Sequence, residues 1–298
     1  MECCRVFARP TLIPLVALLW GCAPGQGPGQ SAATQPAVPD RALSIVIRLE
    51  PTDLTVSGGD YARIAVALFG AGLGAKDQHE IPYPVLADAL PQLDTDSWRV
   101  EPSGRMETRF QLRPGLTWHD GTPLEAEDFA FGFQADQARI KAGSGPRSDL
   151  NADLVNRLES ITAAGPSTLV MGWREPYAEA ATPYVMARPR HLLKESFDQG
   201  TIESFTRDAY WTTAYVGLGP YRLTRWEPGV FIEARGFDGY ALGRPRIERV
   251  VLTWSGDPNA TLTRLLAGDA TSRSTWESTS SKPRCCARTG SRARDPSS

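Results

Sequence analysis

Five titratable side chains close together in the sequence are the best candidates for chemistry. His119 and Asp120 are adjacent, and Glu125, Glu127 and Asp128 follow them. Such a group could bind a metal ion or supply an acid and a base to a reaction. The sequence around Asp120 is typical of a turn whose carboxylate bonds nearby backbone, and carboxylates at a helix start are favoured by the helix dipole. A structural role is therefore favoured over a catalytic one.

The other residues that could hold a metal or a cofactor lack a suitable spacing. His79 and His191 lie far apart in the sequence. The glycine-rich residues 70–74 follow a helical pattern instead of a strand, so we expect the exit of a helix and not a phosphate-binding loop. The cysteines lie only near the two ends of the chain, so its body has neither a disulfide framework nor a Cys-based zinc site. They are Cys3, Cys4, Cys22, Cys285 and Cys286. We expect no cofactor and no catalysed reaction.

The composition is that of a globular protein. Of 298 residues, 41% are hydrophobic and 22% charged, and 32 Lys and Arg nearly balance 34 Asp and Glu. A net charge of −2 gives no reason to expect nucleic acid as a partner, because phosphate binding needs a clustered cationic surface. The sequence has no uninterrupted apolar run of about 20 residues, which excludes a fully intramembrane protein.

The first residues have the pattern of an export signal. Arg5 and Arg9 precede a short apolar run that ends at Gly21-Cys22. A small residue before a cysteine at this place resembles the bacterial lipobox, whose cysteine is lipidated and becomes the new N-terminus. We therefore predict a lipoprotein signal peptide over residues 1–22, lipidation of Cys22 and a flexible linker over residues 23–41, which has no aromatic residue.

The body alternates predicted strands with predicted helices, which indicates an α/β protein. Period-two alternation of apolar residues predicts strands at 43–49, 106–112 and 169–173, and a hairpin over 221–234. Helical spacing predicts helices from Asp60 and over residues 125–140. Residues 249–254 form a nearly continuous apolar strand, and a helix with Asp257 as its cap and Gly268 past its end follows.

The composition changes at residue 271. Residues 271–298 contain twelve Ser or Thr, and Trp276 is their only large apolar side chain. Such a segment buries too little apolar surface to order itself, so we predict a disordered tail. It also supplies no parallel strand after the last helix, which favours non-native sequence over the alternative, a basic interaction tail.

Four stretches of the body together resemble a known family, the oligopeptide-, dipeptide- and nickel-binding group (family 5) of extracytoplasmic solute-binding proteins of ABC importers. They occur in the family's order and spacing over about residues 42–270. The stretches are residues 113–124 (RPGLTWHDGTPL), 217–223 (GLGPYRL), 239–247 (GYALGRPRI), and 257–259 (DPN) with 266–269 (LAGD).

The resemblance implies a periplasmic-binding-protein-like clamshell of the class with an extra N-terminal subdomain. Residues 42–270 would form its N-terminal lobe, with most of the second lobe missing, so the chain is expected to be truncated at its C-terminus. The implied function is to bind peptides or similar small solutes and deliver them to permease subunits. The protein would be a monomer, lipid-anchored at the outer face of the membrane or in the periplasmic space. A clamshell with one lobe is expected to bind solute weakly or not at all.

The resemblance also suggests where ligand would bind. Glu50 ends the first predicted strand, at the position after which the family chain meets ligand. Tyr61, Trp211 and Tyr215 lie near strand ends or the crossover, so they are candidate walls of the site, although core packing explains them equally well.

Two alternatives from other classes stay open. The first is an extracytoplasmic hydrolase that uses carboxylates such as Asp120 and Glu127, which requires both acids to face one cleft. The second is an interaction lobe that contacts a partner without ligand, which binding to a permease in the absence of solute would favour.

Overall fold

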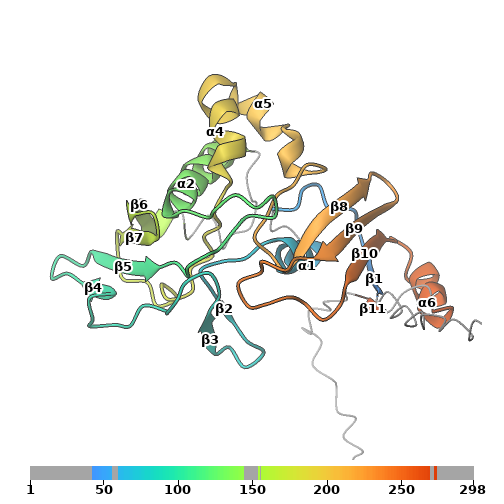
Figure 1. Cartoon of the computed structure of the whole chain (residues 1–298), viewed down its shortest axis with the longest axis horizontal. Coiled ribbons are helices and arrows are strands. Elements are labelled where there is room, and N and C mark those ends of the chain that lie inside the picture. The colour runs from blue at the N-terminus through green and yellow to red at the C-terminus, as the bar shows by residue number, and fades with distance from the viewer. Residues whose placement is uncertain (1–41, 56–59, 144–153, 155, 269–271, 274–298) are drawn as a thin grey trace, which may run out of the picture. The chain divides into compact units, whose positions relative to one another are not determined.

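The computed structural model describes residues 42–55, 60–143, 154, 156–268 and 272–273 (Figure 1). All of them belong to the second of two compact units, which spans residues 40–298. The predicted signal peptide with Cys22, the predicted linker and nearly all of the predicted tail lie outside the described residues. Within these ranges, none of the helices combines the length and the apolar character that crossing a bilayer requires.

A five-stranded mixed sheet is built from both ends of the described chain. β1 and β10 are parallel and pair from Ala42↔Arg249 to Ile47↔Trp254, whereas β9 and β8 are antiparallel to their neighbours. In order across the sheet, the strands are β11 (Ser272–Arg273), β1 (Ala42–Ile47), β10 (Arg249–Trp254), β9 (Phe231–Gly236) and β8 (Tyr221–Glu227). The strands and the hairpin predicted here are confirmed, except that β1 ends at Ile47, two residues before the predicted end.

One prediction about this sheet is wrong. The sequence pattern gave no parallel strand after the last helix, yet Ser272 and Arg273 pair in parallel with Ile45 and Val46 of β1. Backbone hydrogen bonds to a strand edge do not depend on apolar side chains, so a Ser-rich segment can supply them. The rest of the predicted tail is outside the described residues.

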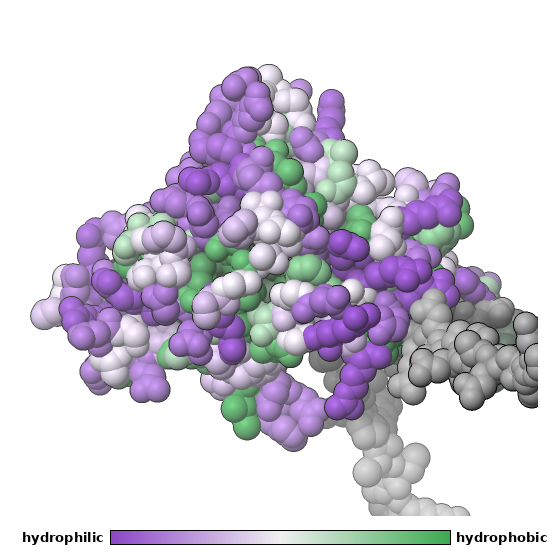
Figure 2. Space-filling model, in the orientation of Figure 1, coloured by the Kyte–Doolittle hydropathy of each residue, from purple (hydrophilic) through white to green (hydrophobic). Residues whose placement is uncertain are grey.

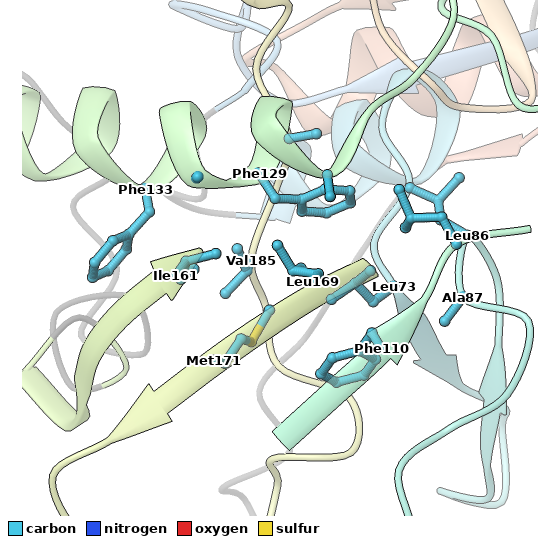
Figure 3. Packing of buried hydrophobic residues seen from close by; sticks show 14 of the residues in the cluster. Leu73, Leu86, Ala87, Phe110, Phe129, Phe133, Ile161, Leu169, Met171 and Val185 are labelled. Carbon is cyan, nitrogen blue, oxygen red and sulfur yellow. The ribbon is translucent and has the colours of Figure 1, made fainter. Parts of the chain in front are cut away.

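A second, antiparallel sheet carries the longest helix on one face. In order, its strands are β4 (Trp98–Val100), β5 (Met106–Gln111), β7 (Thr168–Trp173) and β6 (Leu158–Gly165), and the helix is α2 (Ala126–Lys141). Figure 3 shows Phe129 and Phe133 of α2 pointing toward this sheet, where Ile161 of β6 and Leu169 and Met171 of β7 belong to the same hydrophobic core. The alternation of β5 and β7 buries one side of each strand, as predicted.

Shorter elements complete the structure. They are α1 (Asp60–Phe69), the hairpin β2 (Gly74–Lys76) and β3 (Pro82–Pro84), α4 (Arg190–Gln199), α5 (Ile202–Thr206), the 3-10 turn Ala209–Trp211 and α6 (Pro258–Leu266). Four of them, α1, α4, α5 and the 3-10 turn, contribute residues to a second hydrophobic core. Asp257 caps α6 by accepting from Asn259 N–H at 2.8 Å, and Gly268 takes a φ of 80° past its end, as predicted. Figure 2 shows polar residues over most of the face in view, with hydrophobic residues in smaller patches.

Candidate functional site

A cavity of about 470 Å³ lies beside the C-terminal half of α1. Its walls come from α1, from the β2–β3 hairpin, from the segment 179–186 and from Tyr240, so four separate parts of the chain build it. The lining residues are Val66, Ala67, Gly70, Ala71, Gly72, Gly74, Ala75, Lys76, Tyr83, Val85, Glu179, Thr182, Pro183, Tyr184, Met186 and Tyr240. Ligand pockets in proteins typically measure about 300–1,000 Å³ and are mostly apolar, so this cavity has the size of one.

Small residues bring the backbone close to the cavity. A Cβ atom at Gly74 would lie 2.7 Å from Leu90 Cδ2, and a Cβ atom at Gly70 would lie 2.7 Å from Met186 Cε. The end of α1 is also held in place, because Gly219 N–H donates to the carbonyl oxygen of Phe69 at 3.0 Å. The exit of a helix predicted for residues 70–74 is therefore confirmed, and it also lines a cavity.

One ion pair spans the rim of the cavity. Lys76 of β2 bonds the carboxylate of Glu179, and its Nζ lies 3.7 Å from Glu80 Oε2. The hydrogen bond to Glu179 raises the pKa of Lys76, with burial acting in the opposite direction. The phenol of Tyr240 also lies here, and its pKa is raised by burial and by Tyr83. Both groups therefore keep their protons at neutral pH.

Glu50 lies away from this cavity, at the turn between β8 and β9. Its Oε1 accepts from the indole N–H of Trp226 at 2.9 Å, and its Oε2 accepts from the N–H of Gly229 at 3.0 Å. The carboxylate thus attaches the end of β1 to the hairpin turn. A ligand contact by Glu50 stays a prediction, and such a contact would have to share this carboxylate with the turn.

Trp211 and Tyr215 are brought together in the second core. Each ring packs against Tyr210, with centroids 5.0 and 5.3 Å apart, and burial raises the pKa of Tyr215 to about 12. Trp211 is 2% exposed and Tyr215 6%, and neither lines the cavity. Their predicted role as ligand walls stays a prediction. For Tyr61 only the backbone is described, in the first turn of α1, the helix that lines the cavity further along.

Two buried arginines adjoin this aromatic cluster. The guanidinium of Arg139 lies 3.7 Å from the centroid of a Trp211 ring and donates to Asp53 Oδ2 at 3.1 Å. Arg188 donates to both carboxylate oxygens of Asp136, at 3.0–3.2 Å. Each cation is therefore paired with a carboxylate, as a buried charge requires.

Asp120, Glu127 and Asp128, the acids that could have supplied catalysis, have structural surroundings. Asp120 accepts from Thr122 N–H at 3.0 Å and lies 2.7 Å from His191 Nε2. Burial alone would raise the pKa of Asp120, but hydrogen bonds from His191 and Thr122 lower it overall, which does not suit a general acid. Glu127 lies on the first turn of α2, with an exposed side chain. The two acids thus lie on a loop and on a helix surface, the placement expected to count against a hydrolase.

Asp128 joins the start of α2 to two other segments. Its Oδ2 accepts from Glu125 N–H at 3.0 Å and from the indole N–H of Trp118 at 3.2 Å, and its Oδ1 accepts from Arg190 N–H at 3.1 Å. Burial raises its pKa, although these bonds act in the opposite direction. The residues described by the structure contain no group of three or more His, Cys, Asp or Glu that could hold a metal ion.

Sequence reasoning did not find Lys76, Glu179 or the three tyrosines of the cavity as site residues. They lie on segments far apart along the chain, and no local pattern links them. The available signal was the run of Gly and Ala at residues 70–75, because residues without large side chains mark places where a ligand or another backbone approaches closely.

Comparisons with known proteins place this chain in a protein family. The model of the family described as bacterial extracellular solute-binding proteins, family 5 Middle, matches residues 88–283. The match runs past residue 270, where the resemblance was expected to end.

Relatives and solved structures agree with this match. Protein XP55 of Streptomyces lividans is 31% identical over 234 residues, which are 77% of this chain and 39% of that protein. The oligopeptide-binding protein of Thermus thermophilus, complexed with a pentapeptide, has a TM-score of 0.66 at 20% identity, over 78% of this chain and 44% of that one. NikZ of Campylobacter jejuni, in complex with Ni(L-His), has a TM-score of 0.61 at 22% identity, over 78% and 43%.

The structural likenesses show the fold. The mixed five-stranded sheet and the antiparallel four-stranded sheet, with their helices, correspond to part of a periplasmic-binding-protein clamshell, as the resemblance implied. The chain spans less than half the length of each of these three proteins.

Proposed function

This chain belongs to family 5 of the bacterial extracellular solute-binding proteins, and we propose that it binds peptides or similar small solutes for delivery to an ABC permease. The observation that carries this proposal is the cavity beside α1. It is large enough for a small ligand, and its lining includes six Gly or Ala residues and three tyrosines. Tyrosine rings supply large, rigid apolar contact area while their hydroxyls remain available for hydrogen bonds.

Support for a peptide comes from the relatives. The Bacillus subtilis protein AppA, 22% identical over 187 residues, is named an oligopeptide-binding protein, and the Thermus structure contains a pentapeptide. NikZ, with a similar fold, holds a nickel–histidine complex, which is a different small solute. Peptides are therefore the first class of solute to test, and metal chelates the second.

The proposed mechanism is closure without a chemical step. A ligand that touches two lobes stabilises the closed arrangement, which a permease can recognise, since a ligand shifts an equilibrium by its difference in affinity for the two states. The residues of this cavity would form one wall of such a site. Weak binding or no binding by this chain alone stays a prediction; of the two we propose weak binding, so the assay must detect millimolar affinities.

Ligand-detected saturation-transfer NMR on the full 298-residue chain meets this requirement. We expect saturation transfer to Ala-Phe-Ala and none to glucose. Ala67 is an exposed residue of α1 that lines the cavity, so Ala67→Phe should fill the space and abolish transfer. Ala260 is an exposed residue of α6 outside the cavity, and Ala260→Phe serves as the matched control. A signal that survives Ala67→Phe would refute this assignment of the site.

We also propose that the protein is monomeric and is anchored outside the cytoplasmic membrane through a lipid on Cys22. The support is the lipobox-like sequence ending at Gly21-Cys22 and the extracellular family. Expression in a bacterial host should give a product that partitions into detergent, and Cys22→Ser should move it to the aqueous phase. Unchanged partitioning of Cys22→Ser would refute lipidation at this residue.

A further inference from the structure

Apart from Lys76 and Glu179, the residues that line the cavity beside α1 carry no charged side chain. Much of this lining is small and apolar, and we call Ala67 and the residues 70–75 other than Leu73 the apolar floor; Val66, Val85 and Met186 also line the cavity. A charged group placed on such a surface loses its hydration without gaining a partner, which is strongly unfavourable. An apolar or aromatic group has no such favourable hydration to lose, and it gains contact with the tyrosine rings.

The two charged lining residues occupy the rim and are bonded to each other. Lys76 comes from β2, and Glu179 comes from the segment that leads to Tyr184. Each side chain is partly exposed, 32% for Lys76 and 51% for Glu179, so both charges can be reached from solvent. A ligand cation must compete with Lys76 for Glu179, and a ligand anion must compete with Glu179 for Lys76.

The two competitions are unequal. Lys76 has a second carboxylate, Glu80, at 3.7 Å, so the rim as a whole has more negative than positive charge. A ligand anion would have to displace or outcompete two carboxylates, whereas a ligand cation faces one ammonium group. Acidic ligands are therefore opposed more strongly than basic ones.

We propose that this cavity selects peptides with a bulky uncharged side chain, and that the Lys76–Glu179 pair is the residue pair that excludes charged side chains. This inference rests on the proposed function, because it assigns the substrate class of the same site. It makes the pair a determinant of specificity, distinct from the apolar floor that provides the contact area. Removing one partner should then admit side chains of the charge that this partner carried.

Four tripeptides test this, with the same backbone and different central residues: Ala-Phe-Ala, Ala-Leu-Ala, Ala-Lys-Ala and Ala-Glu-Ala. Their dissociation constants for the full chain are measured by ligand-detected NMR titration. We expect the Phe and Leu peptides to bind at least about tenfold more tightly than the Lys and Glu peptides, with the Glu peptide weakest. Lys76→Met should strengthen binding of the Lys peptide by about tenfold and leave the Phe peptide unchanged.

The reciprocal variant is Glu179→Gln, which should strengthen binding of the Glu peptide by a smaller factor because Glu80 remains. Lys194→Met and Glu175→Gln are matched controls, since each removes one member of an exposed ion pair that does not line the cavity. Both controls should leave all four dissociation constants unchanged. Circular dichroism melts confirm that the four variants are folded.

The outcomes separate the inference from the function on which it rests. Equal binding of the four peptides to the unmodified chain would overturn the inference and leave peptide binding intact. Preference for the uncharged peptides with no change in Lys76→Met and Glu179→Gln would overturn the role of the pair. No binding of any peptide to the unmodified chain or either variant would overturn both the inference and the proposed function.

Discussion

Lowering the pH is expected to destabilise the protein through one histidine, His119. The ring Nδ1 accepts from Gly217 N–H at 3.2 Å, and the ring Nε2–H donates to the carbonyl oxygen of Gly219 at 2.9 Å. The ring also lies edge-on to Phe237, with centroids 4.9 Å apart. This neutral tautomer holds the loop at residue 119 against the segment that anchors α1. A protonated ring could not accept from Gly217, so this bond would be lost.

The size of the effect follows from the pKa. Burial lowers the pKa of His119 from 6.5 to about 4, with the bond to Gly219 acting in the opposite direction. Only 3% of His119 is exposed, so solvent screening reduces the free energy that corresponds to this pKa difference only slightly. At about 1.4 kcal/mol per pH unit, the difference corresponds to about 3 kcal/mol. The unfolded chain binds the proton more tightly, so this stabilisation is complete above pH 6.5 and is lost as the pH falls to about 4.

Urea unfolding at pH 7, 5.5 and 4, followed by tryptophan fluorescence, measures this contribution. Other carboxylates also titrate in this range, so the informative quantity is the free energy of unfolding of the wild type minus that of His119→Gln. This difference should shrink by about 3 kcal/mol from pH 7 to pH 4. His79→Gln, at an exposed histidine, is the matched control variant. A difference for His119→Gln that stays constant within about 0.5 kcal/mol would refute the reasoning.

Three further predictions concern packing and buried polar groups, each measured by urea unfolding at pH 7. Asp128→Ala should lower the free energy of unfolding by about 2–4 kcal/mol because its three donors lose their acceptor; a loss below about 1 kcal/mol would contradict this. Gly132→Ala should cost about 1–3 kcal/mol despite its better helix propensity, because the new Cβ would lie 2.5 Å from the Met186 carbonyl oxygen, and a stabilised variant would show that this contact relaxes. Arg188→Met should cost about 3–5 kcal/mol by leaving Asp136 unpaired, and adding Asp136→Asn should recover part of it; no recovery would disprove the pairing.

Much of the local structure could be predicted because its causes are local. The alternation of apolar residues in 106–111 and 169–173 depends only on the pleat of a strand, and Asp257 caps α6 through an atom two residues away. The family could also be predicted, since the ordered set of short motifs carries the resemblance that the comparisons confirm. The short strand Ser272–Arg273 could not be predicted, because its pairing uses backbone groups that every residue type except proline has.

The residues of the candidate site could not be predicted from the sequence, because the tertiary structure brings them together. The Gly and Ala residues at 70–75 show a need for small side chains, but the reason, contact with Met186 and Leu90, comes from segments distant in the sequence. Lys76 and Glu179 meet only because the β2–β3 hairpin and the segment 179–186 close around the same cavity. The sequence by itself determined the elements and the family, because these depend on near neighbours and on ordered motifs. Which side chains line one cavity depends on which distant segments of the chain pack together. Only the folded structure establishes this.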